Sequence, residues 1–345
     1  MKHKQQHIKI KREGKILKKK FYLTLDTETA TLPWANEICK DEKAKQRVAI
    51  ARPLVYDIGW VISDRLGNIV KKVNYLVQET FFVPNIFNTA YYCNKRPIYM
   101  ELLAKQEIIP KCWDEIILEL INDIKKVNAV TAYNATFDFK KAIPFTEEYI
   151  KKLYSPDYNN WEKKQKAITK RIAENKIKRD EGNPEFLNPV FKLRNISVPI
   201  IDLWSIACNR LINIDKYRKY CLDNEYWTAS IQFFKTSAET SFQYLEKQYD
   251  FVESHTALSD AIIETVILTK ALKRGKVEPQ IDSFPFRQLG TTFDFVSTKS
   301  PKHKNKLINA LFNYISENDG WDKKGSYWGK MRNAYNALIG GTNEN

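Results

Sequence analysis

The stretch FYLTLDTETA, residues 21–30, is the first strongly apolar segment of the chain, and its pattern predicts a buried strand. Successive strand residues face opposite sides, so Leu23 and Leu25 face one side of the predicted sheet. Asp26 and Glu28 face the other, with their Cα atoms within roughly 7 Å. Two buried carboxylates repel each other, and a divalent cation with oxygen ligands would stabilise both. A solvated strand end, or pairing with lysine, is the alternative explanation.

The composition predicts one large folded domain, or one domain with additions. The chain has 345 residues, of which 43% are hydrophobic and 13% aromatic, enough for a substantial core. No apolar run approaches the ~18 residues of a membrane helix, so no membrane association is expected. The five cysteines are scattered and form no C-x-x-C pair, which argues against a disulfide framework or a zinc site. We therefore expect a reducing, cytoplasmic compartment. The abundance of Lys, Asn and Ile is typical of an AT-rich genome, such as that of a phage or of a low-GC bacterium.

The charge balance favours a polyanionic partner. The net charge is +15 and the pI is about 9.3, so nucleic acid is the first candidate partner. Residues 1–20, with nine Lys or Arg, predict a basic N-terminal arm, and residues 163–181 carry eight more. An anionic membrane surface, or solvated helix faces that serve only solubility, are the alternatives.

The order of the expected elements indicates an α/β fold with a mixed five-stranded sheet flanked by helices. Two strands at 55–64 and 68–78 follow the first and form a hairpin around the turn sequence DRLGN. The remaining expected elements are helices at 98–108 and 113–126, a strand at 127–134, a helix limited by Pro144, a strand entering a helix at 198–208, and helices at 236–248 and 255–275.

Two further acids and one histidine occur at positions that suit chemistry. Asp138 follows a short strand near a helix start, and Asp260 lies early in an apolar helix. Asp138 alone is better explained as an acid that caps a helix, and Glu264, one turn after Asp260, is explained as an ordinary surface acid. His255 lies beside the core-like helix that carries Asp260. An imidazole exchanges protons near neutral pH, so a histidine there suits a general base, although a structural hydrogen bond is the commoner role.

Three motifs in this order, LDTET, YNATFD and HTALSDA, resemble those of the DEDDh family of 3′–5′ exonucleases. That family includes ribonuclease T and the proofreading subunits of bacterial DNA polymerase III. Asp26, Glu28, Asp138 and Asp260 match its four acids, and His255 matches the histidine of its H-x-x-x-x-D motif. The resemblance covers about 21–144 and 197–275.

The resemblance implies a ribonuclease-H-like fold and a metal-dependent 3′–5′ exonuclease that releases nucleoside 5′-monophosphates. We expect single-stranded DNA as the favoured substrate, although the motifs themselves do not separate DNA from RNA. It implies two Mg²⁺ or Mn²⁺ ions per site, held by Asp26, Glu28, Asp138 and Asp260, with Asp26 between them. It also implies that His255 takes the proton from the attacking water.

The residues just after the first motif are expected to grip the terminal nucleotide, as the resemblance implies. They are Thr29, Leu32 and Trp34 in this chain. The Trp34 ring could stack on a base, a contact worth ~1–3 kcal/mol. Packing of this ring on the long loop that follows is the alternative.

The chain departs from the family pattern in three segments, which affects substrate choice more than chemistry. Residues 30–53 are longer than the usual link, residues 146–195 are a charged insertion predicted to hold an exposed basic helix, and residues 276–345 form a C-terminal extension. The nuclease domain is thus expected at 21–275. The extension is a candidate substrate-binding element, or a docking element for a polymerase or another replication partner. A 3′-end-trimming exoribonuclease, and a non-catalytic nucleic-acid-binding scaffold on the same fold, remain open as alternatives.

Overall fold

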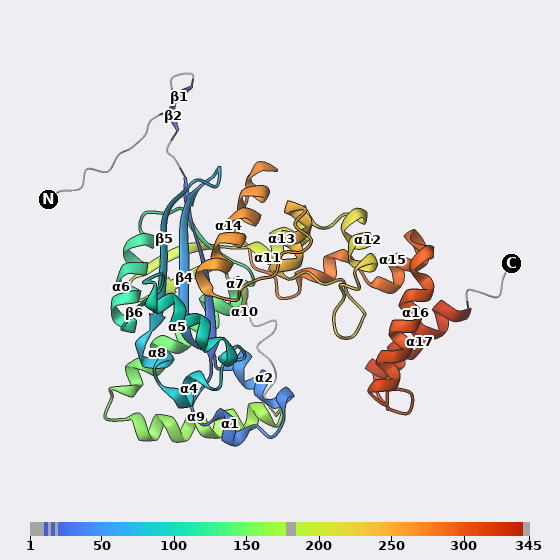
Figure 1. The fold of residues 1–345 in the computed structure, drawn as a ribbon, viewed down its shortest axis with the longest axis horizontal. Helices are drawn as coiled ribbons and strands as arrows, with labels where there is room; N and C mark the ends of the chain where they lie inside the picture. Colours follow the sequence, from blue (N-terminus) through green and yellow to red (C-terminus); the bar gives the residue numbers. More distant parts are fainter. Residues whose placement is uncertain (1–9, 13–14, 18–19, 177–183, 341–345) are drawn as a thin grey trace. The chain divides into compact units, whose positions relative to one another are not determined.

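The computed structural model describes residues 10–12, 15–17, 20–176 and 184–340 (Figure 1). Its main feature is a seven-stranded mixed sheet flanked by helices. The strands of this sheet are β3 (Phe21–Ala30), β4 (Leu54–Asp64), β5 (Ile69–Val77), β6 (Ile109–Lys111), β7 (Ala129–Ala132), β8 (Val190–Leu193) and β9 (Ile196–Asp202).

The strands follow the order β6-β5-β4-β3-β7-β9-β8. The first three in the chain, β3, β4 and β5, form an antiparallel meander, and β7 and β9 run parallel to β3 on its other side. All five predicted strands are confirmed, but the sheet has seven strands rather than five. The two additional strands, β6 and β8, lie at the edges and are three and four residues long. Segments this short carry too little alternation to be predicted.

The helices of the sheet-containing part confirm most of the predicted ones. They are α1 (Ala35–Ile38), α2 (Glu42–Ala51), α3 (Gln78–Phe81), α4 (Pro84–Phe87), α5 (Arg96–Ala104), α6 (Trp113–Ile124), α7 (Ala135–Phe137), α8 (Ile143–Leu153), α9 (Tyr158–Ala173), α10 (Pro184–Leu187) and α14 (Ala257–Lys273). Short 3₁₀ and π turns, η1 (Cys93–Lys95) and η2 (Asp138–Ala142), lie before α5 and between α7 and α8.

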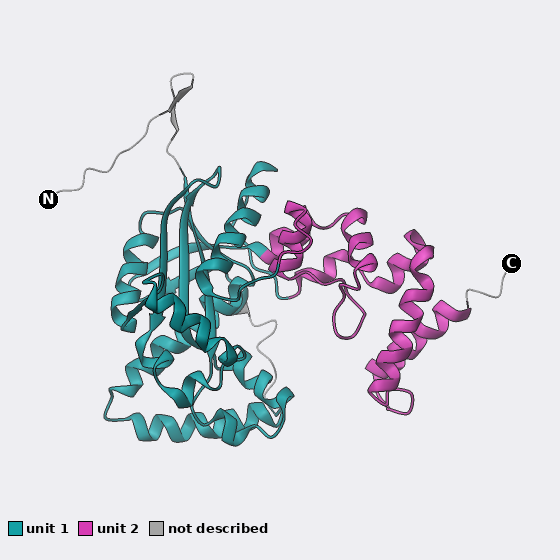
Figure 2. Ribbon diagram, in the orientation of Figure 1, with its two compact units in different colours: residues 1–203, 252–283 teal, residues 204–251, 284–345 magenta. Residues whose placement is uncertain are grey.

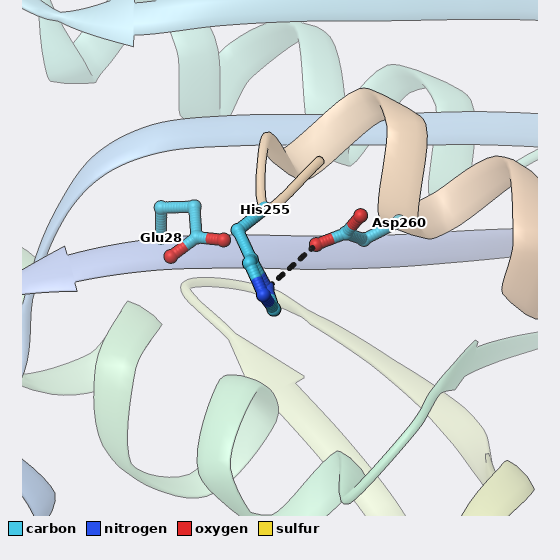
Figure 3. A group of neighbouring side chains, drawn as sticks. All are labelled: Glu28, His255 and Asp260. Carbon is cyan, nitrogen blue, oxygen red and sulfur yellow. Dashed lines mark ion pairs between the residues drawn. The ribbon is translucent and has the colours of Figure 1, made fainter. Parts of the chain in front are cut away.

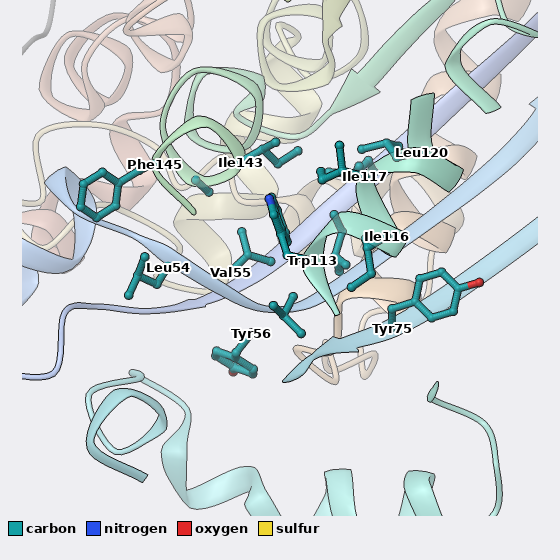
Figure 4. Close-up of a cluster of buried hydrophobic side chains, with 14 of the residues drawn as sticks. Leu54, Val55, Tyr56, Tyr75, Trp113, Ile116, Ile117, Leu120, Ile143 and Phe145 are labelled. Atoms are coloured by element: carbon teal, nitrogen blue, oxygen red, sulfur yellow. The ribbon is translucent and has the colours of Figure 1, made fainter. Parts of the chain in front are cut away.

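One face of the sheet forms the main hydrophobic core with α6 and α8 (Figure 4). Trp113, Ile116 and Leu120 of α6 are buried here, as the helical spacing of the apolar residues predicts. They pack with Leu23 and Leu25 of β3 in one contiguous cluster. Helix α14 packs against β3 and β4 on the opposite face, which is the face that carries the acids.

Pro144 does not end the helix that starts near residue 135. The helix continues through Pro144 into α8, because the wide π turn η2 precedes it, with the Ile143 amide donating to the Asp138 carbonyl. Pro144 lies in the first turn of α8, where its missing N–H is tolerated.

Residues 30–53 were expected to form a loop, but they contain α1 and α2. The Asp41 carboxylate accepts a hydrogen bond of 2.7 Å from the Ala44 amide and so caps α2. The small apolar cluster beneath these helices also includes Ile172 of α9. One face of the predicted basic helix is therefore buried, and only the remainder of α9 is exposed. The predicted insertion also contributes strand β8 to the sheet, so it is only partly separate from the fold.

The chain forms two compact units (Figure 2). Unit 1 comprises residues 1–203 and 252–283, and unit 2 comprises residues 204–251 and 284–345. Residues 204–251 therefore belong to the same unit as the C-terminal extension. The sequence instead predicts that they are part of a nuclease domain that ends at residue 275.

Unit 2 is helical in its described residues. Its elements are η3 (Ala207–Leu211), α12 (Asp215–Asp223), α13 (Ala238–Glu246), η4 (Pro285–Leu289), α15 (Thr292–Lys299), η5 (Pro301–His303), α16 (Lys304–Glu317) and α17 (Ser326–Gly340), with α11 (Leu203–Ile206) at the junction. Leu311 of α16 and Met331 of α17 are buried, so the extension has an apolar core of its own.

The N-terminal arm is described only in part. Strands β1 (Ile10–Arg12) and β2 (Lys15–Leu17) form an antiparallel ribbon, and the other positions of the predicted basic arm up to residue 19 lie outside the described residues. No helix among the described residues combines the length and the hydrophobicity that a membrane span requires.

Candidate metal centre

Strand β3 lies in the middle of the sheet and presents Asp26 and Glu28 on one face, as its alternation predicts. Asp26 pairs with Gly59 of β4, and Glu28 pairs with Asp57. Both acids on β3 are partly buried, and Asp57 is fully buried. Three carboxylates therefore lie on one small area of two adjacent central strands.

Gly59 allows helix α14 to approach this area. A Cβ atom on residue 59 would lie 2.3 Å from the backbone nitrogen of Leu258, so only a residue without a side chain fits. The Asp57 carboxylate also accepts a hydrogen bond of 2.9 Å from the Ala257 amide at the first turn of α14. These two contacts fix the start of α14 over the acidic face of β3, and Asp260 follows in the same turn.

Glu28, His255 and Asp260 form the tightest group of candidate ligands among the described residues (Figure 3). Their candidate ligand atoms all lie within 4.8 Å of one another. His255 Nδ1 lies 4.0 Å from Asp260 Oδ2 and 3.7 Å from Glu253 Oε2. The imidazole therefore lies between two carboxylates.

The His255 backbone adopts a left-handed conformation, with φ of 52°. Such a conformation is costly for a residue with a side chain and persists only where its surroundings fix it. The imidazole stacks on the Tyr92 ring at 4.4 Å between centroids, and Lys95 lies over the same ring and donates to the Ser254 carbonyl at 2.6 Å. The segment around Tyr92 and Lys95 thus fixes the loop that carries His255.

Asp138 lies at the start of the π turn η2 and is 2% exposed. Its Oδ1 accepts a hydrogen bond of 2.6 Å from Thr27 Oγ1 on β3, which ties it directly to the strand of the first two acids. The turn before it is held by Asp202, which accepts a hydrogen bond of 3.1 Å from the Ala135 amide.

The four acids predicted from the sequence act on one another electrostatically. Burial, and then the charges of Glu264, Asp138, Asp260 and Glu28, raise the pKa of Asp26 well above its usual range. Burial raises the pKa of Asp138 to about 7 and, together with nearby acids, that of Asp260 to about 8. Such shifts are expected where like charges are buried together without enough cations.

The donor set fits a divalent cation. Among the described residues, Asp260 Oδ1 and Glu264 Oε2 are buried and have no hydrogen-bond partner. A buried carboxylate oxygen without a donor is costly unless a cation contacts it. Grouped carboxylate oxygens are the ligands that Mg²⁺ and Mn²⁺ prefer.

Three features of the site were not predicted. Glu264 was expected to be an ordinary surface acid, and that is wrong, because it is 2% exposed. Its position four residues after Asp260, on the same helical face, is the signal that could have identified it. The roles of Asp57 and Tyr92 had no such signal, since they depend on contacts far apart in the sequence.

The three residues expected to grip a terminal nucleotide differ in accessibility. Thr29 is half-buried, whereas Leu32 is fully buried. Trp34 is 3% exposed, and its Nε1 lies 3.4 Å from Thr169 Oγ1 of α9. The buried Trp34 ring therefore packs against α9, where the Lys166 ammonium lies 5.3 Å from its centroid, and it is not available to stack on a base in this structure.

Comparisons of this chain with models of protein families, with curated proteins and with solved structures give no match.

Proposed function

We propose that this chain is a metal-dependent 3′–5′ exonuclease that removes nucleoside 5′-monophosphates from nucleic acid, with single-stranded DNA as the favoured substrate. One observation carries the proposal. Asp26 and Glu28 lie on β3, Asp138 is hydrogen-bonded to Thr27 of the same strand, and Asp260 of α14 lies within 4.8 Å of Glu28. Asp260 Oδ1 is buried and has no hydrogen-bond partner among the described residues.

The strand order supports a ribonuclease-H-like fold for this site. The antiparallel meander β3-β4-β5, followed by β7 and β9 parallel to β3, places the acid-bearing strand β3 at the centre of the sheet. The motifs LDTET, YNATFD and HTALSDA lie on β3, at the η2 turn and at the start of α14. These positions support the proposed resemblance to the DEDDh family.

In the proposed reaction, Asp26, Glu28, Asp138 and Asp260 hold Mg²⁺ or Mn²⁺. Bound divalent cations would offset the negative charge that develops on the attacking and leaving oxygens of a phosphodiester. His255 accepts the proton of the attacking water, since its side chain is 30% exposed and lies beside Asp260 and Glu253. Tyr92 holds the imidazole in place through its stacked ring.

The charge of the chain supports nucleic acid as the substrate. The net charge of +15 attracts a phosphate backbone. The exposed side of α9 presents Lys163, Lys164 and Lys170, which suit contacts with the phosphates of a single strand. Such contacts position the strand without reading its sequence.

The test uses 5′-labelled single-stranded DNA and RNA oligonucleotides of matched sequence, incubated with Mg²⁺, with Mn²⁺ or with EDTA. We expect a ladder that shortens from the 3′ end, with faster shortening of DNA. EDTA and the variant Asp26→Asn should each abolish it. Glu107→Gln is the matched control, because it also removes one carboxylate but is exposed beside the edge strand β6.

The outcome also separates the alternatives. Faster shortening of RNA would identify a 3′-end-trimming exoribonuclease instead. Binding of both oligonucleotides without cleavage by the wild-type protein would contradict the proposed activity and favour a scaffold role.

A further inference from the structure

Glu264 lies on α14 one turn after Asp260 and is 2% exposed. Its carboxylate accepts a hydrogen bond from the backbone N–H of Tyr133 at the end of β7. Its Oε2 is buried and, among the described residues, has no hydrogen-bond partner. Half of this carboxylate is therefore satisfied, and the other half needs a partner.

The side chains that act most strongly on Glu264 are all acids. Asp138 exerts the largest charge effect on it, followed by Asp260 and Glu253. Glu264 in turn exerts the largest charge effect on Asp26. A glutamate with only a packing role would be destabilised at this position, because each of these acids repels its negative charge.

We infer that Glu264 is a fifth carboxylate ligand of the metal centre, and that it binds a divalent cation together with Asp26 and Asp138. The inference rests on the proposed function insofar as that function requires two cations. Its own basis is the buried Oε2, which has no hydrogen-bond partner among the described residues and lies one helical turn from Asp260 on the same face of α14.

The side chains of the centre, five acids and His255, then form two groups around β3. Glu28, Asp260 and His255 form the first group, within 4.8 Å of one another. Asp26, Asp138 and Glu264 form the second, and their mutual charge effects link them. Two groups of this kind match a two-cation site better than the four acids of the sequence motifs alone, because each cation has three nearby side chains.

The test measures Mn²⁺ binding by isothermal titration calorimetry on the full-length protein without nucleic acid. Glu264→Gln is nearly isosteric and keeps an acceptor for the Tyr133 amide, and Glu264→Asp keeps the carboxylate on a shorter side chain. Glu107→Gln is the control for the loss of one negative charge. Circular dichroism melts of each variant verify that it is folded before the titration.

We expect two Mn²⁺ ions per chain for the wild-type protein and for Glu107→Gln. In Glu264→Gln, one of the two binding events should weaken at least about tenfold, and Glu264→Asp should lie between the two. An unchanged isotherm in both Glu264 variants would overturn the inference and leave the proposed function standing. A wild-type protein that binds no Mn²⁺ would overturn both.

Discussion

Gly59 of β4 and Leu258 of α14 are in backbone contact, and this contact brings Asp260 of α14 close to the acids of β3. A Cβ atom on residue 59 would lie 2.3 Å from the Leu258 nitrogen. Because Gly59 pairs with Asp26 in the sheet, the approach of α14 at this point also determines how near Asp260 comes to β3. The geometry of the centre therefore depends on one residue that has no side chain.

Gly59→Ala should displace the start of α14 and separate Asp260 from Asp26. Overpacking of this kind costs about 1–3 kcal/mol of folding stability, which a chain of this size should survive. Metal-dependent cleavage should fall by at least about a hundredfold, a loss that the modest destabilisation does not explain. Gly329→Ala on α17 is the control, because a Cβ atom there meets open space. Wild-type cleavage by a folded Gly59→Ala protein would contradict this account.

His255→Gln should reduce the turnover number about 10²- to 10⁴-fold, the usual contribution of a general base. KM should change little, because the side chain acts on water and not on the nucleotide. The acidic limb of the pH–rate profile should change in shape as well, because protonation of His255 no longer contributes to it, whereas Asp138 and Asp260 still take up protons there. Tyr92→Leu, which removes only the stacked ring, should give a smaller loss and keep the shape of that limb. Equal pH profiles for His255→Gln and wild type would exclude the general-base role.

The sequence predicts those parts of this molecule that depend on local periodicity. The strand alternation places Asp26 and Glu28 on one face, and the helical spacing places Trp113 in the core, and both are confirmed. These patterns are visible because a single element decides which way each side chain points.

Features that depend on packing between distant segments were predicted poorly. Trp34 is buried because α9 covers it, more than 120 residues later in the chain. Glu264 looked like a surface residue because its partners, Asp26 and Asp138, are brought to it only by the sheet. The edge strand β8 was too short to show alternation. Tertiary contacts determine each of these, and no local pattern encodes them.

The metal-free protein should lose stability as the pH rises. Burial and neighbouring acids raise the pKa of Asp260 to about 8 from a usual value of 3.8. The folded state therefore binds more protons than the unfolded state between about pH 4 and pH 8, so the free energy of unfolding falls across that window. In EDTA, the melting temperature should be lower at pH 8 than at pH 5.

Asp260→Asn should flatten this pH dependence, and Mn²⁺ should raise the melting temperature of the wild-type protein most at pH 8, where the carboxylates are charged. Glu107→Gln, an exposed acid, should retain the wild-type pH dependence. A melting temperature of the wild-type protein that rises from pH 5 to pH 8 in EDTA would show that the acids of the centre are not repelling one another.

The exposed lysines of α9 should contribute to binding through phosphate contacts. Lys163→Gln combined with Lys164→Gln should weaken binding of single-stranded DNA and lower the salt dependence of the binding constant. Each lost phosphate contact reduces the slope by about 0.7 for a single strand. The matched control changes Lys72 and Lys125, which are also exposed but lie on β5 and after α6. If both pairs reduce the slope equally, α9 has no particular role.

The most direct test of the metal centre is anomalous diffraction from crystals of the protein grown with Mn²⁺. We expect two anomalous peaks, one for each bound Mn²⁺ ion, roughly 3.5–4 Å apart. One peak should contact Glu28 and Asp260, and the other Asp138 and Glu264, with Asp26 between them. Well-ordered acids without any anomalous peak, at Mn²⁺ concentrations well above those used for activity, would contradict the claim that these residues exist to hold metal.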